Sequence, residues 1–348
     1  MKDIIKETDF RRDLKGTPAT GYLFFGEEDY LKANALRLAR KTLCGEDEGL
    51  SYFNDIRLGG ADFTPDRLLD AMATPPMGCE RKVITVTGIN LNTMRASDLE
   101  NLIEALSELE NYPFNMVILS ADSDCLDAGA LPKRPSKLLS ELGEYLIPVN
   151  FEKNTPAKLS GWVQKHYAHH GVQASPELCH LTVTYCGRDM YILANEIEKI
   201  AFYVLAHGRN TATEADVKTA AIPALEYDAF AFTNAVMERR QGDALDILAD
   251  LRFRRVEPIF ILSEVSRVVC DLALVGTLGA SGQTAAEISA ALKMHEYRVG
   301  LYLRQAGKLP VERLQAAVTA CKEADAAMKG AMGTAGGFGV IEKLICSL

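Results

Sequence analysis

The first 150 residues alternate short apolar runs with amphipathic stretches. The runs predict buried β-strands at 22–25, 52–58, 82–87, 115–119 and 145–149. Between them, apolar residues at helical spacing predict helices that begin near Leu31, at Thr64-Pro65 and at Ser97. Strands that alternate with helices predict a mostly parallel sheet with helices on both faces. Because the runs lack strict alternation, both faces of these strands are expected to be buried.

The strand pattern stops near Phe151, and the rest of the chain is predicted to be helical. One group of helical segments lies between 155 and 222, and a second group runs from 228 to the end, where the glycine-rich stretch 330–337 separates the last two. The sequence therefore predicts three domains. They are an α/β domain at 1–150, a small helical domain at 151–222 and an all-helical bundle at 223–348.

Composition limits the classes of function. The chain has 348 residues and a formal net charge of −9, which argues against nonspecific coating of DNA, since that affinity depends on Lys and Arg. A membrane span is excluded because no run of eighteen uncharged apolar residues occurs. The mixed charges of residues 1–16 do not resemble a signal peptide, and none of the eight cysteines forms a C-x-x-C pair. We expect a cytoplasmic protein with reduced thiols.

A degenerate phosphate-binding loop follows the first predicted strand. From Gly26 the chain reads G-E-E-D-Y-L-K-A, against the pattern G-x-x-x-x-G-K-[ST]. Gly26 and Lys32 fit this pattern. Leu31 brings a Cβ where the backbone must wrap the phosphates, and Ala33 lacks the hydroxyl that would hold Mg²⁺. Three carboxylates at 27–29 sit at the start of the next helix and repel an anion there.

The strand at 82–87 supports the same interpretation. An NTPase carries an acidic pair after such a strand to hold Mg²⁺, whereas this chain continues with Gly88-Ile89-Asn90. Nucleotide hydrolysis is therefore disfavoured, although an active AAA+ ATPase remains an alternative. No arrangement of nucleophile, base or acid stands out, so we expect no catalytic residues and no cofactor.

Three histidines share one predicted helix face. His166, His169 and His170 stand at positions i, i+3 and i+4, a spacing that can bind a metal ion. No acidic or cysteine ligand lies close to them in sequence. We therefore favour a solvated helix end before Gly171 and expect no metal site.

The N-terminal domain contains one compact basic run. It comprises Lys133, Arg134 and Lys137. These side chains are candidates for a contact with DNA phosphate or with an acidic partner, and a solvated helix start explains them equally well.

Residues 283–304 resemble a helix-turn-helix. A helix of small residues is followed by a tight turn and a second helix with Arg298 and Arg304. The second helix has few polar side chains that could read base edges, so an ordinary corner within the helical bundle is favoured. A DNA-binding regulator that uses this segment remains a second alternative.

This organisation, together with several short motifs, resembles the delta subunit family of the bacterial DNA polymerase III clamp loader. The resemblance covers nearly the whole chain. Its motifs lie at 22–31, 80–86, 187–200, 228–230, 285–288, 325–330 and 342–345. Each motif alone is weakly specific. The resemblance becomes specific because the motifs occur in the family's order and at its spacing.

The resemblance implies a fold and a function. The fold is an AAA+ type module with a RecA-like α/β domain, a helical lid and a helical collar. A subunit of this family does not hydrolyse ATP, and it binds and opens the sliding clamp. Its collar packs with the ATPase subunits and the delta-prime subunit of the loader, and the assembled complex acts on primed DNA. The isolated chain is expected to be a monomer.

The resemblance also implies a clamp-binding segment. In the family, an apolar Leu-Phe pair precedes the strand that begins near residue 81. Here the segment at 74–80 reads T-P-P-M-G-C-E. Met77 takes the place of Leu, and Gly78 stands where Phe is expected. Either Met77 with Pro75 and Pro76 fills the clamp pocket more weakly, or the register differs by a residue or two. A simple Pro-Pro turn before the strand is the structural alternative.

Overall fold

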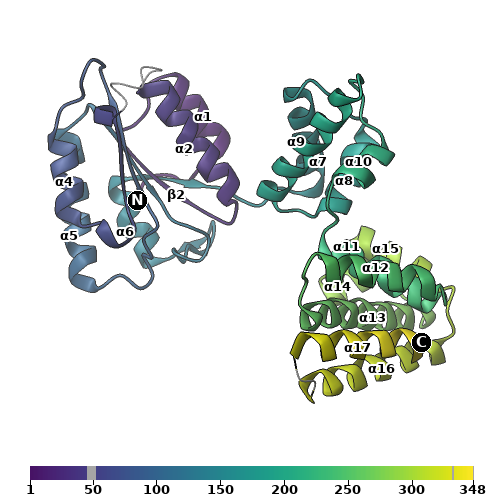
Figure 1. Cartoon of the computed structure of the whole chain (residues 1–348). Coiled ribbons are helices and arrows are strands. Elements are labelled where there is room, and N and C mark those ends of the chain that lie inside the picture. The colour runs from purple at the N-terminus through teal and green to yellow at the C-terminus, as the bar shows by residue number, and fades with distance from the viewer. Residues whose placement is uncertain (45–51, 331–332, 348) are drawn as a thin grey trace. The chain divides into compact units, whose positions relative to one another are not determined.

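The computed structural model describes residues 1–44, 52–330 and 333–347 (Figure 1). It separates into two compact units, Met1–Lys158 and Leu159–Leu348, and their boundary lies within α7 (Pro156–His169). The division into three domains at 150 and 222 stays a prediction. Within the described residues, no helix is long and apolar enough to cross a membrane.

A six-stranded parallel sheet forms the centre of the first unit. Its order is β1-β8-β2-β5-β4-β3. The strands are β1 Ile5–Lys6, β2 Gly21–Phe25, β3 Asp55–Gly59, β4 Lys82–Thr87, β5 Asn115–Ser120 and β8 Ile147–Asn150. The five longer strands, numbered along the chain, stand in the order 5-1-4-3-2. This doubly wound order confirms the predicted RecA-like α/β fold.

Helices cover both faces of this sheet. Helices α1 (Glu7–Lys15) and α2 (Asp29–Leu43) lie on one face. Helices α4 (Pro65–Ala73), α5 (Ala96–Ser107) and α6 (Lys137–Tyr145) lie on the other (Figure 1). Strand β2 explains the continuous apolar runs of the sequence. Tyr22 and Phe24 pack toward α1 and α2, while Leu23 and Phe25 join the core on the opposite face.

The remaining elements of this unit are short. The 3-10 helices are Gly60–Asp62 and Glu108–Asn111, and an antiparallel hairpin pairs β6 (Gly129–Ala130) with β7 (Arg134–Pro135). Thr64 caps α4 as predicted, because its hydroxyl accepts a hydrogen bond from the Arg67 backbone N–H at 3.3 Å. The predicted Ser97 cap is wrong, since α5 begins at Ala96.

The prediction of a strand over 52–58 is wrong at its start. Residues 52–54 are helical, and β3 begins only at Asp55. Tyr52 and Phe53 have the strand propensity typical of aromatic residues. However, neither side chain packs into the sheet, and context overrides that propensity.

Sequence analysis missed β1, α1 and the β6–β7 hairpin. Helix α1 and strand β1 lie in a charged segment whose buried side chains are only Phe10 and Leu14. Helix α6 begins at Lys137, in agreement with the helix start offered for the basic run, and the next strand starts at Ile147 rather than at residue 145. The last helix also starts earlier than predicted, at Gly333 within the glycine-rich stretch. Glycine lowers helix propensity without preventing a helix that other residues pack.

The second unit is entirely helical apart from an isolated bridge between Gln173 and Thr211. Its helices after α7 are α8 Pro176–Cys186, α9 Met190–Ala206, α10 Glu214–Ala220, α11 Leu225–Met237, α12 Gln241–Phe253, α13 Pro258–Ala280, α14 Ala285–Leu292, α15 Glu296–Ala306, α16 Val311–Gly330 and α17 Gly333–Ser347. Helices α11 to α17 share one apolar core, and we call them the C-terminal bundle. This arrangement confirms the predicted helical region after the sheet.

Removing the Phe10 side chain should destabilise the first unit strongly. Phe10 is fully buried, and its ring meets Tyr22 and Phe24 edge-on at centroid distances of 4.9 and 4.8 Å. We expect Phe10→Ala to lower the free energy of unfolding by about 3–5 kcal/mol, measured by urea denaturation. Arg12→Ala on the same helix, where the side chain is 75% exposed, should change it by less than about 0.5 kcal/mol. Equal effects would contradict the packing of α1.

Candidate functional site

The loop after β2 occupies the place where a doubly wound sheet binds phosphate. Strand β2 lies between β5 and β8, so the strand order reverses at its carboxyl end. Only residues 26–28 connect β2 to α2, which begins at Asp29. Leu31, Lys32 and Ala33 are therefore already helical. The backbone has no extended loop here that could wrap a polyphosphate.

Gly26 is needed for the close packing of this loop. Its φ angle is +103°, and a Cβ there would lie 2.6 Å from both the Phe151 carbonyl oxygen and Asn150 Oδ1. The backbone N–H of Glu28 donates to the same Phe151 carbonyl at 3.0 Å. Gly26 thus fits the phosphate-loop pattern for a structural reason, which is the approach of the loop to the end of β8.

The ammonium group of Lys32 is fully used inside the protein. The side chain is buried, and Nζ donates to the carbonyl oxygens of Ala121 at 2.6 Å and of Gly26 at 2.9 Å. It also pairs with Asp29 Oδ1 at 2.7 Å. An ammonium group has three N–H donors, and three partners surround this one. In this arrangement Lys32 has no N–H left for a phosphate.

A pocket of about 330 Å³ beside the loop presents acidic groups. Glu27 and Glu152 line it, together with Lys153 and Asn150. The Lys153 ammonium is 3.5 Å from Glu27 Oε2, so this cation is paired. Two carboxylates at the entrance to α2 oppose an anionic ligand.

In the turn after β4, the polar side chain of Asn90 makes hydrogen bonds within the turn itself. Asn90 Oδ1 accepts hydrogen bonds from the backbone N–H groups of Asn92 at 3.1 Å and Thr93 at 3.2 Å. Residues 88–90, where an NTPase carries its acidic pair, contain no carboxylate.

The predicted clamp-binding segment, residues 74–80, connects α4 to β4 on the surface. Met77 is 49% exposed, Pro75 is exposed and Pro76 is half-buried. Gly78 adopts φ +70°, in the left-handed region that favours glycine. A phenylalanine at this position would be strained, which gives a physical reason for its absence.

Buried polar side chains fix the helix end before this segment. Lys82 is buried, and its ammonium group donates to the carbonyl oxygens of Ala71 and Thr74. The Asn115 amide donates to the Met72 carbonyl oxygen at 3.0 Å. These contacts satisfy carbonyl groups at the C-terminal end of α4, which have no partner within the helix. They also tie α4 to β4 and β5.

Asn54 holds the segment at its centre and was not predicted. It is fully buried, its Oδ1 accepts from the Met77 backbone N–H at 2.8 Å, and its Nδ2 donates to the Met77 carbonyl oxygen at 2.7 Å. The two residues are 23 positions apart. The only signal in the sequence is a lone Asn at the start of a strand, which does not identify its partner.

The basic run lies on the surface of the same unit. Lys133 and Arg134 are exposed in the β6–β7 hairpin, and Lys137 is the first residue of α6, where its ammonium group lies 3.3 Å from Glu141 Oε1. The three side chains do not surround a common ligand site in the contacts of the described residues. Their contact with DNA or a partner stays a prediction.

The three histidines lie at the C-terminal end of α7, where His169 is exposed and His166 and His170 are half-buried against aromatic rings. Trp162 stacks on His166 with centroids 4.6 Å apart, and the His170 ring meets Phe202 of α9 at 6.0 Å. Burial, and then the neighbouring His170 and His169, lower the pKa of His166. Among the described residues, no group of three His, Cys, Asp or Glu is arranged to hold a metal ion.

The helix-turn-helix-like segment forms a corner of the C-terminal bundle. Helices α14 and α15 are joined by a turn in which Lys293 adopts φ +51°. The Arg298 guanidinium lies 2.8 Å from Glu226 Oε1 and 3.4 Å from Asp271 Oδ2, and it also donates to the Tyr302 hydroxyl at 3.1 Å. Arg298 therefore joins α15 to α11 and α13, which weakens its candidacy as a base-reading side chain.

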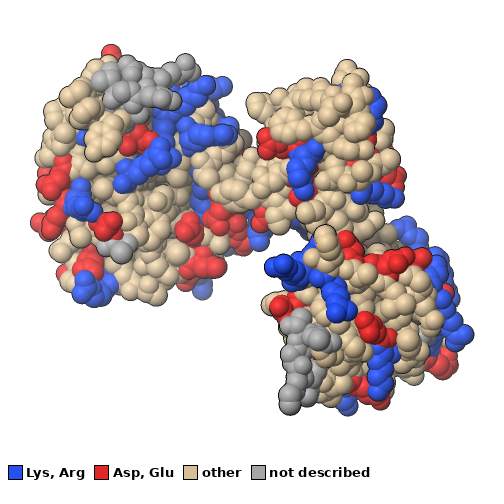
Figure 2. All heavy atoms as spheres, viewed as in Figure 1, with Lys and Arg blue, Asp and Glu red and all other residues tan. Residues whose placement is uncertain are grey.

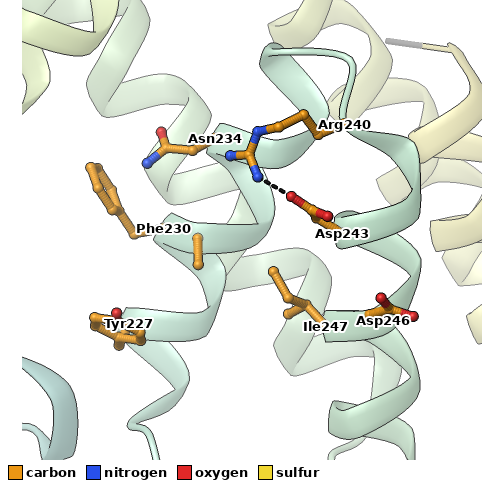
Figure 3. Close-up of a pocket in the computed structure, with 8 residues that line it drawn as sticks. Tyr227, Phe230, Asn234, Arg240, Asp243, Asp246 and Ile247 are labelled. Carbon is orange, nitrogen blue, oxygen red and sulfur yellow. Dashed lines mark hydrogen bonds and ion pairs between the residues drawn. The ribbon is translucent and has the colours of Figure 1, made fainter. Parts of the chain in front are cut away.

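A pocket of about 570 Å³ lies between α11 and α12 (Figure 3). Tyr227, Phe230 and Ile247 provide apolar walls. Arg240 donates to Asp243 across the upper part of the pocket. The side-chain oxygen of Asn234 is buried without a hydrogen-bond partner in the described part of the chain.

The distribution of charge differs between the two units: on the viewed face of Met1–Lys158, Lys and Arg gather toward the upper part (Figure 2). Figure 2 shows Lys and Arg interspersed with Asp and Glu on the viewed face of the helical unit. The whole chain carries 38 basic and 47 acidic residues, so acidic groups outnumber basic ones. An interface with nucleic acid would have to be local.

Comparisons with known proteins agree along the chain. Residues 226–336 match the family described as DNA polymerase III delta subunit, C-terminal domain. The DNA polymerase III subunit delta of Bacillus subtilis (strain 168) is 23% identical over 323 residues, which cover 90% of this chain and 89% of that protein. The solved structure of the Bacillus subtilis DNA clamp loader delta protein aligns with a TM-score of 0.57 at 21% identity, over 98% of each chain.

The sheet order, the short loop after β2 and the helices that follow define a RecA-like α/β module joined to a helical region. Within that fold, residues 226–336 match the C-terminal domain of the DNA polymerase III delta subunit family. Over 90% of its length, the chain is also similar to a DNA polymerase III subunit delta.

Replacing Lys32 should affect folding. Lys32→Ala leaves the buried carbonyl oxygens of Gly26 and Ala121 without this donor, so we expect the free energy of unfolding to fall by about 2–4 kcal/mol in urea denaturation. Lys153→Ala is a matched control beside the same loop, with a side chain that is 70% exposed, and should change stability by less than about 0.5 kcal/mol. A Lys32→Ala variant as stable as the control would mean that the ammonium group is available for another role.

Proposed function

We propose that this chain is a non-hydrolysing subunit of the DNA polymerase III clamp loader, and that it binds and opens the sliding clamp for loading onto primed DNA. Its similarity to the delta subunit over 90% of the chain, and the match of residues 226–336 to the family's C-terminal domain, support the assignment to the polymerase. The observation that carries the proposal is the loop after β2. There the ammonium group of Lys32, the candidate phosphate-binding lysine, contacts oxygen atoms of Gly26, Ala121 and Asp29.

Three features of the loop support the absence of ATP hydrolysis. Helix α2 begins at Asp29, three residues before Lys32, which leaves too little loop for a phosphate cradle. Ala33 offers no hydroxyl for Mg²⁺, and Glu27 with Glu152 places negative charge at the pocket. All three disfavour a Mg-nucleotide complex at the same position.

The surface segment at 74–80 supports clamp binding. Its apolar Met77 side chain is half exposed, and its backbone is fixed through the two hydrogen bonds to buried Asn54. A backbone that is already fixed loses little conformational entropy on binding, which suits a segment that carries an anchor into a partner's pocket. In the proposed complex, Met77 with Pro75 and Pro76 occupies an apolar pocket on one protomer of the clamp.

The C-terminal bundle is the proposed contact with the other loader subunits, which are the ATPase subunits and the delta-prime subunit. The pocket between α11 and α12 supports a role for this region, because its apolar walls, which include Tyr227, Phe230 and Ile247, suit an apolar side chain of a partner. Primed DNA is a partner of the assembled complex, and Lys133, Arg134 and Lys137 are proposed local contacts with it.

Millimolar Mg-ATP should leave the thermal stability of the isolated chain unchanged. A ligand present at a hundred times its dissociation constant adds about 2.7 kcal/mol to the stability of the folded state, which a thermal melt detects. We expect no shift of the melting temperature, because the loop has neither a free lysine N–H nor room for the phosphates. A nucleotide-binding AAA+ subunit serves as positive control. A saturable rise in melting temperature would favour the ATPase alternative.

The purified chain should bind the cognate sliding clamp, and Met77→Ala should weaken that binding at least about tenfold, measured by a surface biosensor. The loss follows from removal of an apolar anchor that is 49% exposed in the free chain. Leu274→Ala on α13 removes a similarly exposed apolar side chain, 51%, and should leave the affinity unchanged. Absence of binding at micromolar clamp would contradict the proposed function.

A further inference from the structure

A second pair of exposed apolar side chains stands next to the Met77 segment. Tyr52 is 81% exposed and Phe53 is 46% exposed. Their rings meet edge-on, with centroids 5.5 Å apart. These residues immediately precede Asn54, whose side chain is hydrogen-bonded to Met77. Two segments that are far apart in sequence, and that the Asn54–Met77 hydrogen bonds bring together, therefore each expose large apolar side chains.

The link between the two segments is rigid. The Asn54 carboxamide donates one hydrogen bond to the Met77 carbonyl oxygen and accepts one from the Met77 backbone N–H. These two bonds fix both the position and the direction of the backbone at Met77. The carbonyl oxygen of Asn54 also accepts a hydrogen bond from Cys44 Sγ at 3.0 Å. Since Asn54 is fully buried, breaking this link would leave polar groups unsatisfied. The backbones that carry the exposed side chains are thus held together.

The same arrangement provides an aromatic group that residues 74–80 lack. Gly78 has no side chain, and its φ angle of +70° disfavours any other residue. Phe53 and Tyr52 bring aromatic rings to the neighbourhood of Met77 from the other segment. Aromatic residues are enriched among the side chains that dominate binding energy in protein interfaces.

We propose that Tyr52 and Phe53 join Met77 in one composite apolar surface that docks into the sliding clamp. The proposal rests on the proposed function and extends the clamp contact beyond residues 74–80. The occupant follows from continuity with the Met77 segment and from shape. Apolar side chains that project from a surface need a partner with an apolar pocket, and neither pocket described above includes these residues.

The test measures the affinity of the cognate sliding clamp for wild type, Tyr52→Ala, Phe53→Ala and Met77→Ala on a biosensor. We expect Phe53→Ala and Met77→Ala each to weaken binding about tenfold or more, and Tyr52→Ala to weaken it at least threefold. The double variant Phe53→Ala/Met77→Ala should lose less than the product of the two single effects, because side chains that share one pocket are coupled. Phe260→Ala, at a site 61% exposed in the helical unit, is the matched control and should bind as wild type does.

The outcomes separate this inference from the proposed function. If wild type does not bind the clamp, both fail. If Met77→Ala weakens binding while both aromatic variants bind as wild type does, the composite surface is wrong and the function stands. The inference also fails if Phe260→Ala is equally weak, or if sedimentation reveals a dimer that Tyr52→Ala dissociates, since the surface would then join two copies of this chain. Thermal melts verify folding, and Tyr52→Ala keeps the test valid if Phe53→Ala does not fold.

Discussion

The buried ammonium group of Lys32 is the interaction on which the first unit depends. It joins the end of β2, the first turn of α2 and the residue that follows β5, through Gly26, Asp29 and Ala121. Burial of an isolated charge is costly, and this one is tolerated because every donor has an oxygen partner. In a phosphate loop this lysine would contact the nucleotide. Here it contacts oxygen atoms of the protein on both sides of the loop instead. One interaction thus stabilises the carboxyl ends of the central strands and occupies the lysine that a phosphate loop would need.

A similar arrangement at the opposite end of the strands supports the candidate clamp contact. Lys82 and Asn115 satisfy the carbonyl groups at the end of α4, and Arg81 donates to the carbonyl oxygens of Pro18, Ala19 and Asn115. Together with Asn54, these contacts leave the surface segment little freedom of its own. An apolar anchor on such a support needs no folding step when it binds, which favours affinity from a small contact.

Much of the fold was predictable because its signals are local. The strands of the sheet centre are apolar runs, and Thr64-Pro65 marks a helix start, so a single pass along the sequence identifies them. Helix α1 escaped detection because it buries only Phe10 and Leu14. The site was half predictable. The sequence indicates a disabled loop, but the contact from Lys32 to Ala121 spans 89 positions, and the contact from Asn54 to Met77 spans 23. Long-range hydrogen bonds of this kind leave no periodic pattern.

A rigid first unit constrains how clamp binding can be controlled, if the proposed function holds. In an active NTPase, the loop after the first strand changes its contacts with the phosphate state and moves the elements around it. Here that loop is fixed by Lys32 and by the packing of Gly26 against β8. A ligand shifts a conformational equilibrium only if it binds the two conformations with different affinity. The contacts of Lys32 and Gly26 hold the loop after β2 in one conformation, so the loop does not provide two conformations for a nucleotide to select. Control of the clamp contact must then come from elsewhere, through movement of the unit as a whole or through a partner that covers Met77 and its aromatic neighbours.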